Sequence, residues 1–175
     1  MGIGIIYRAR SKITKGGLYS LYCTLVLPYL DYCCEIWGNT YKSNLKKLSL
    51  LQKKAVRNVC ESNYLSHTQP LFRMLSCLKF EDLVHLKTAV FMYKAFNDLL
   101  PSNIQKMFVR GIAIHDYATR QQHNLYVQQV NTTLRKNSIS IVGTKIWNKL
   151  EVVIKTKPSV MSFKNALKLF LLGQY

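Results

Sequence analysis

One stretch of the chain, residues 28–57, constrains the fold most because it joins an apolar half to a strongly two-sided basic half. We expect the basic half, from about Ser43 to Cys60, to be a helix, since its apolar and basic side chains separate at about 100° per residue. The apolar wall contains Leu45, Leu48, Leu51, Ala55, Val56 and Val59. The basic wall contains Lys46, Lys47, Lys53, Lys54 and Arg57, with Leu50 among them.

This helix lacks the charge pairing that is usual on protein surfaces. No acidic side chain occurs between Ile36 and Cys60, whereas surface helices usually mix charges of both signs at i,i+4 spacing. The basic wall is therefore either an ordinary solvated face or a face that binds an anion. The absence of acidic partners favours a helix that faces nucleic acid.

The charge of the whole chain indicates the same class of partner. Among 175 residues, 25 are Lys or Arg and 8 are Asp or Glu, which gives a net charge of +17. Such a charge favours polyanions, so nucleic acid is the first candidate and an anionic membrane surface the second. A second basic patch is predicted where no acidic residue separates Arg120, Arg135, Lys136, Lys145 and Lys149.

The hydrophobic pattern predicts a mainly α-helical chain with a smaller mixed α+β C-terminal unit. Helices are expected over residues 2–10, 18–37, 71–78, 80–100 and 101–108, and again over 144–150 and 159–172. The apolar run from Leu18 to Trp37 is expected to break near Pro28 and not to span a membrane, because Asp31 and Glu35 interrupt it. Short β-type runs at 123–130 and 139–142 are the basis for the mixed unit.

No catalytic, metal or cofactor motif is present. The five cysteines are odd in number and form no CxxC pair, which predicts an intracellular chain with reduced thiols. Glu81 and Asp82 are the only adjacent carboxylates, and their place at a helix start has a capping explanation. Asp31 and Glu35 could share a helix face but have no third partner, so pairing with a basic residue is the simpler role. We expect no catalytic residue, no metal and no cofactor.

Tyrosines supply the aromatic faces that single-strand and hybrid-duplex binders combine with Lys and Arg. Four of the eleven tyrosines lie near basic residues or in polar stretches, namely Tyr41, Tyr64, Tyr117 and Tyr126. Most tyrosines in proteins are half-buried core residues, so each of these is only a candidate for stacking on a base.

Several blocks of the sequence, taken together and in order, resemble one family. They are LYCTLVLPYLDYCCEIWGNTY at 21–41, LKKLSLLQKKAVR at 45–57, HTQPLFRMLSCLKFEDLVHLKTAVFMYKAFNDLLP at 67–101, YATRQQ at 117–122, SISIVGTKIWNKL at 138–150 and SFKNALKLFLL at 162–172. They resemble the region after the polymerase core of reverse transcriptases from LINE-type, non-LTR retrotransposons of the jockey-like group.

The resemblance implies a division of the chain into three parts. Residues 1–60 would be thumb-like helices truncated at the N-terminus, 61–110 a helical post-thumb region and 111–175 the small mixed unit. It implies RNA or RNA–DNA hybrid as the partner, with target DNA as a further one. By position alone, the basic wall at 46–57 corresponds to the thumb surface that faces nucleic acid.

The departures from the family limit what the resemblance carries over. Its palm has a Tyr-x-Asp-Asp-type metal signature, whereas Tyr29-Leu30-Asp31-Tyr32 lacks the paired aspartates. The expected function is therefore a non-catalytic C-terminal fragment of an RNA-directed DNA polymerase. Three alternatives stand beside it: polymerase activity of the chain itself, a module that self-associates through Leu18 to Trp37, and binding to anionic membranes.

Overall fold

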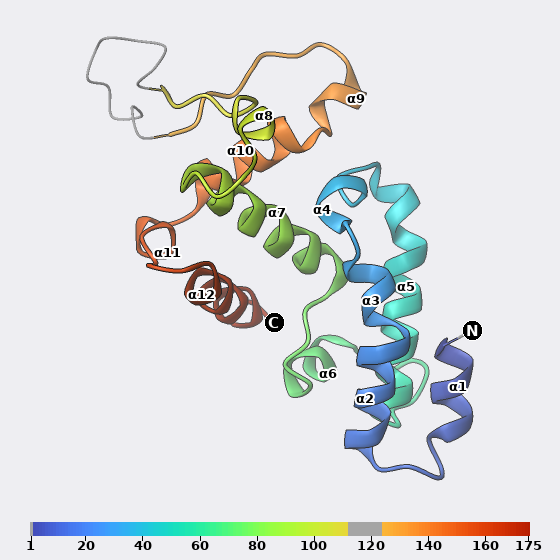
Figure 1. Cartoon of the computed structure of the whole chain (residues 1–175). Helices are drawn as coiled ribbons and strands as arrows, with labels where there is room; N and C mark the ends of the chain where they lie inside the picture. The colour runs from blue at the N-terminus through green and yellow to red at the C-terminus, as the bar shows by residue number, and fades with distance from the viewer. Residues whose placement is uncertain (1, 112–123) are drawn as a thin grey trace. The chain divides into compact units, whose positions relative to one another are not determined.

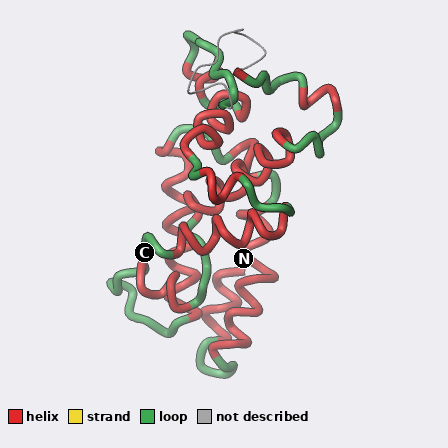
Figure 2. The backbone as a smooth tube through the Cα atoms, turned by 90° about the vertical axis from the view of Figure 1, so that its left-hand side faces the viewer, coloured by secondary structure: helices red, strands yellow, loops and turns green. Residues whose placement is uncertain are grey.

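The computed structural model describes residues 2–111 and 124–175, and in this part of the chain the secondary structure is helical (Figures 1 and 2). Its helices, in chain order, are α1 (Gly2–Ala9), α2 (Lys15–Leu25), α3 (Leu27–Asp31), α4 (Cys34–Trp37), α5 (Lys42–Val59), α6 (Gln69–Met74), α7 (Phe80–Phe96), α8 (Ser102–Gln105), α9 (Thr133–Lys136), α10 (Ile139–Lys149), α11 (Val152–Lys155) and α12 (Val160–Leu172). The mainly α class predicted from the hydrophobic pattern is confirmed.

The chain separates into two compact units. Unit 1 contains Met1–Cys34, Thr40–Val84 and Lys168–Tyr175, and unit 2 contains Glu35–Asn39 and His85–Leu167. The three-part division at residues 60 and 110 follows sequence order and remains a prediction.

Unit 1 is built around α5. Helix α1 packs against α2 and α5, and α2 also packs against α5 and α3 (Figure 1). The chain breaks at Val26, and Pro28 then lies in the first turn of α3, where its missing N–H is no loss. The expected break of the apolar run near Pro28 is confirmed.

The buried face of α5 contains polar residues that the helical periodicity of the sequence did not single out. The side-chain amide of Gln52 is 1% exposed, and its Nε2 donates to Tyr22 Oη and to the Leu78 carbonyl, both at 3.0 Å. Ser49 is also buried and donates to Glu81. Leu51 was expected on the buried apolar wall, but its side chain is 49% exposed.

An aromatic cluster forms the core of unit 2. The ring of Tyr93 from α7 lies 4.6 Å from that of Phe163, and the ring of Phe96 lies 5.0 Å from that of Trp147, measured between centroids. The Tyr93 hydroxyl also donates to the Lys157 carbonyl at 2.6 Å. At Gly143 of α10, an added Cβ would lie 2.6 Å from Met92 Sδ, so the missing side chain permits a close approach of α10 to α7.

The prediction of a mixed α+β C-terminal unit is wrong for the described residues. The expected β-type run at 139–142 lies inside α10, because Ile141, Thr144 and Trp147 are buried at helical spacing and this packing overrides β-propensity. Near the other run, pairing is limited to an isolated bridge between Arg110 and Leu125. The backbone N–H of Leu125 donates to Asn148 Oδ1 at 3.0 Å, and its C=O accepts from Asn148 Nδ2 at 2.8 Å. A side chain, and not a neighbouring strand, therefore satisfies this residue.

Helix ends in this chain use left-handed residues other than glycine. Glu61 follows α5, Ser76 follows α6 and Asp98 follows α7, with φ of 53°, 48° and 59°. A residue with positive φ just after a helix ends it, and glycine is the usual choice because other residues are strained there.

The helices of the described residues include none that is long and apolar enough to cross a bilayer.

Candidate nucleic-acid interface

The exposed side of α5 carries the basic residues predicted from the helical wheel. Lys46, Lys47 and Lys54 are exposed, whereas Lys53 is half-buried. Leu50 lies among them and is 55% exposed. We call Lys46, Lys47, Lys53 and Lys54 the α5 lysine face.

Lys42 extends the α5 lysine face and was not included in the basic wall predicted from the sequence. It is the first residue of α5 and is exposed, one helical turn before Lys46. Its i,i+4 spacing to Lys46 was the signal that could have identified it.

Arg57 differs from the lysines because the fold already uses its guanidinium. Its Nε donates to the Ser66 carbonyl at 2.9 Å, and its Cζ lies 5.9 Å from the centroid of the Tyr64 ring. These contacts tie the C-terminal turn of α5 to the loop that follows it. Arg57 therefore makes a structural contact at the edge of the α5 lysine face, and its role in binding nucleic acid stays a prediction.

The second predicted patch lies in unit 2. Arg135 and Lys136 are exposed on α9, and Lys145 and Lys149 are exposed on α10, which contacts α9. Arg120 and Tyr117 lie outside the described residues. The structure brings Arg135, Lys136 and Lys145 to two neighbouring helices of one unit.

The candidate stacking tyrosines that are described are all exposed. Tyr64 is 73% exposed, Tyr41 at the start of α5 is 54% exposed and Tyr126 is 44% exposed. Tyr41 and Tyr64 therefore present aromatic rings at the two ends of the helix that carries the α5 lysine face.

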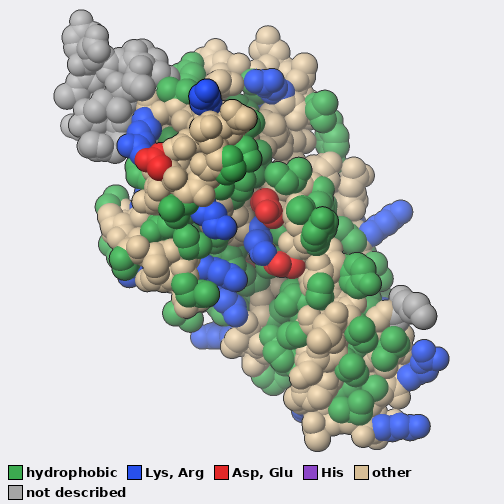
Figure 3. Space-filling view, in the orientation of Figure 1, with side chains coloured by type: hydrophobic (Ala, Val, Ile, Leu, Met, Phe, Trp, Pro, Cys, Tyr) green, Lys and Arg blue, Asp and Glu red, His purple; other side chains and the backbone are tan. Residues whose placement is uncertain are grey.

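Among the charged side chains on the surface in view, basic ones prevail. Figure 3 shows Lys and Arg side chains spread over this face, while acidic side chains appear at few places. In unit 1, hydrophobic side chains also gather over the region of α1, α2 and α3 (Figure 3). Tyr29 of α3 is 80% exposed.

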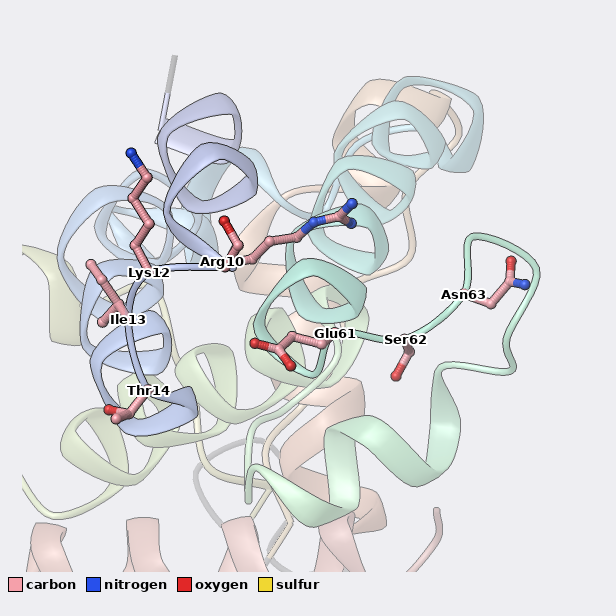
Figure 4. A pocket seen from close by; sticks show the side chains of 8 residues that line it. Arg10, Lys12, Ile13, Thr14, Glu61, Ser62 and Asn63 are labelled. Carbon is pink, nitrogen blue, oxygen red and sulfur yellow. The ribbon is translucent and has the colours of Figure 1, made fainter.

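A polar cavity of about 820 Å³ lies beside the end of α5 (Figure 4). Its lining comes from the turn after α1, including Arg10 and Lys12, and from Glu61 to Asn63. In Figure 4 the Lys12 side chain points away from Glu61. Because Glu61 places a carboxylate in the same cavity as Arg10, this site suits a polyanion less well than the acid-free α5 lysine face.

The adjacent carboxylates are occupied by tertiary hydrogen bonds. Glu81 accepts from the Ser49 hydroxyl of α5, and Asp82 accepts from the Tyr175 hydroxyl at 2.6 Å. Among the described residues, no three His, Cys, Asp or Glu side chains lie close enough together to hold a metal ion.

Burial changes the acidity of several groups near these contacts. It raises the pKa of the Tyr22 hydroxyl and of the Cys77 thiol, which donates to Tyr22 Oη at 3.5 Å. Burial also raises the pKa of Tyr19 to about 12, with further contributions from Cys77 and Cys23. All five cysteines are free thiols.

Comparison with known proteins gives one distant relative. The chain is 29% identical over 73 residues to the RNA-directed DNA polymerase from mobile element jockey of Drosophila melanogaster. This match supports a distant relation to that polymerase. It covers 42% of this chain and 8% of the relative. No family model and no solved structure matches the chain.

Proposed function

We propose that this chain is a non-catalytic C-terminal part of a jockey-like retrotransposon reverse transcriptase and binds RNA or RNA–DNA hybrid through backbone phosphates. The observation that carries the proposal is the α5 lysine face, where Lys46, Lys47 and Lys54 are exposed on a helix without acidic residues. The similarity to the jockey polymerase supports nucleic acid as the polyanion. Target DNA is a further partner of the same chemistry.

The chemistry of the proposed binding is electrostatic and independent of base sequence. Lysine ammonium groups that neutralise phosphates release condensed counterions, so affinity falls as salt rises. Exposed Tyr41 and Tyr64 add ring faces on which unpaired bases can stack. Arg135, Lys136 and Lys145 of unit 2, with Arg120, are proposed as a second phosphate-binding patch.

The chain itself is proposed to be inactive as a polymerase. Two-metal phosphoryl transfer uses carboxylates that hold Mg²⁺ ions about 4 Å apart. Glu81 and Asp82 are each committed to a hydrogen bond with another segment of unit 1. Primer extension on a homopolymer template with Mg²⁺ or Mn²⁺ tests this part, and product above background would overturn it.

The binding experiment is a salt titration of a fluorescent RNA–DNA hybrid, followed by anisotropy. About six phosphate contacts would give a log–log slope of roughly −5. Changing Lys46, Lys47 and Lys54 together to Gln should weaken binding to all sequences and reduce the slope by roughly 2–3. The matched control changes Lys12, Arg73 and Lys106, also exposed, and removes the same charge from elsewhere. Equal binding by the two triple variants would overturn the site.

A second candidate function is self-association through the run from Leu18 to Trp37. The observation that favours it is the exposure of large apolar side chains there, with Tyr29 80% and Ile36 59% exposed. Sedimentation velocity of the parent and of Tyr29→Ser distinguishes this candidate. A mass above one protomer that falls in the variant would support it, and a monomeric parent would exclude it.

A further inference from the structure

A cavity of about 440 Å³ within unit 2 combines an apolar lining with charged side chains. Its apolar lining is Leu86, Val90, Phe91, Leu100, Val160 and Met161. Its charged lining is Glu35, Lys87, Lys94 and Lys164. The volume lies in the range of small-molecule sites, which are mostly apolar with a few polar groups that fix orientation.

One oxygen of the Glu35 carboxylate lacks a donor. Oε2 of Glu35 is buried and has no hydrogen-bond partner among the described residues. The neighbouring Asn39 amide does not serve it, because Asn39 Nδ2 donates to the main-chain carbonyl of Glu35 at 2.8 Å. A buried acceptor without a donor costs free energy, so a ligand that donates a hydrogen bond here would be stabilised.

The lysines of the cavity favour an anionic group on the same ligand. Lys87 and Lys94 are seven residues apart on α7 and so lie on one face of it, and Lys164 comes from α12. Even without Lys87, the two ammonium groups of Lys94 and Lys164 against the one carboxylate of Glu35 leave the cavity lining positive.

These requirements select among ligand classes. A fatty acid or another apolar carboxylate would leave Glu35 without a donor and add a like charge. Inorganic phosphate would leave the apolar lining without a partner. A nucleotide offers a flat base for the apolar walls, an amino group for Glu35 and a phosphate for the lysines.

We infer that this cavity binds an unpaired nucleotide whose base carries an amino group. Glu35 accepts from the amino group of guanine, adenine or cytosine, and Lys94 and Lys164 hold the phosphate. Uracil binds worse, because a carbonyl oxygen takes the place of the cytosine amino group and meets the carboxylate. The inference rests on the proposed function only for the source of the nucleotide, a single-stranded part of the bound RNA.

The test uses the full chain with ¹³C-methyl methionine, observed by NMR. Met161 lines the cavity, and its signal is assigned with Met161→Leu. GMP and CMP should shift this signal to saturation, UMP should bind roughly ten-fold more weakly, and inorganic phosphate should leave it in place. Because free mononucleotides are the probes, the result does not depend on the α5 lysine face.

Two variants test the roles of the charged residues. Glu35→Gln should reduce the preference for GMP over UMP, because the amide can donate to the uracil carbonyl as well as accept. Lys164→Gln should weaken the binding of GMP and the binding of UMP by the same factor. Lys106→Gln, at an exposed position of the same unit outside both proposed sites, is the matched control and should change the affinity for neither nucleotide.

Three results would overturn the inference. They are no shift of Met161 with GMP, an equal shift with inorganic phosphate, and equal affinity for GMP and UMP that Glu35→Gln does not alter. The hybrid titration is read separately. Loss of hybrid binding in the α5 triple variant with GMP binding intact supports both sites, and hybrid binding unaffected by that variant counts against the proposed function alone.

Discussion

The hydroxyl of Tyr175 donates a hydrogen bond to Oδ2 of Asp82 at 2.6 Å. The hydroxyl oxygen of Tyr175 accepts from the Lys79 N–H at 2.8 Å, and the Lys79 ammonium lies 4.0 Å from the centroid of the Tyr175 ring. The residues after α12 are thus joined to the start of α7 within unit 1. A carboxylate that could have been a metal ligand stabilises the fold instead.

Removing this hydroxyl should destabilise the protein. Tyr175→Phe leaves the Lys79 N–H and the Asp82 carboxylate without their shared partner, and we expect a loss of about 1–3 kcal/mol in the free energy of unfolding. Urea denaturation followed by circular dichroism measures it. Tyr126→Phe, at an exposed position, is the control, and equal midpoints for the two variants would contradict the prediction.

Arg57 and Lys54 should respond differently to the same substitution. Arg57→Gln removes the Nε donor to the Ser66 carbonyl and should lower the free energy of unfolding by about 1–3 kcal/mol. Lys54→Gln, on the exposed side of α5, should change it by less than about 0.5 kcal/mol. Thermal unfolding of both variants checks this, and a stable Arg57→Gln would show that the Ser66 contact does not matter.

Stability should decline at alkaline pH. Burial raises the folded-state pKa of Tyr19 to about 12 and also raises those of Tyr22 and Tyr175. A raised folded-state pKa contributes stability that is complete below the unfolded value of about 10 and is lost as pH rises through the folded value. Helical signal and tyrosinate absorbance should change together above a pH of about 10. Simple ionisation of all tyrosines near their ordinary pKa, with the helices intact, would contradict this.

Ser76→Gly should stabilise the protein. Ser76 is exposed and has φ of 48°, which strains any residue with a Cβ. Relief of that strain, less the backbone entropy of glycine, should raise the free energy of unfolding by about 0.5–1 kcal/mol. Ser76→Ala keeps the Cβ and serves as the control. A lower midpoint for the glycine variant than for the parent would count against strain at this turn.

The thiols should react at different rates. Cys33 is exposed, whereas Cys60 and Cys77 are buried and burial raises the pKa of each. Because the thiolate is the nucleophile, alkylation at neutral pH should modify Cys33 first and Cys60 and Cys77 last. Mass spectrometry of timed samples gives the order, and early modification of Cys77 in folded protein would contradict it.

The sequence by itself determined the helical class, the order of the main helices and the exposed lysines of α5. Hydrophobic residues at steps of three and four specify a helix wherever one face is buried, and the lysines then fall on the other side. The same reasoning placed Lys46, Lys47 and Lys54 correctly. The prediction for Arg120 stays untested, because this residue lies outside the described residues.

The tertiary structure decided what local patterns leave open. The β-type run at 139–142 became part of α10 because Ile141, Thr144 and Trp147 are buried at helical spacing and Gly143 permits a close approach to Met92 of α7. The Nε of Arg57 donates to the Ser66 carbonyl, so the fold holds this residue at the edge of the basic wall. Leu51 is half exposed, whereas Gln52 is buried and donates two hydrogen bonds. Glu35 and Lys164 are 129 positions apart yet line one cavity. Periodicity reports only neighbours along a helix, whereas these arrangements depend on contacts between segments distant in sequence, which no local spacing encodes.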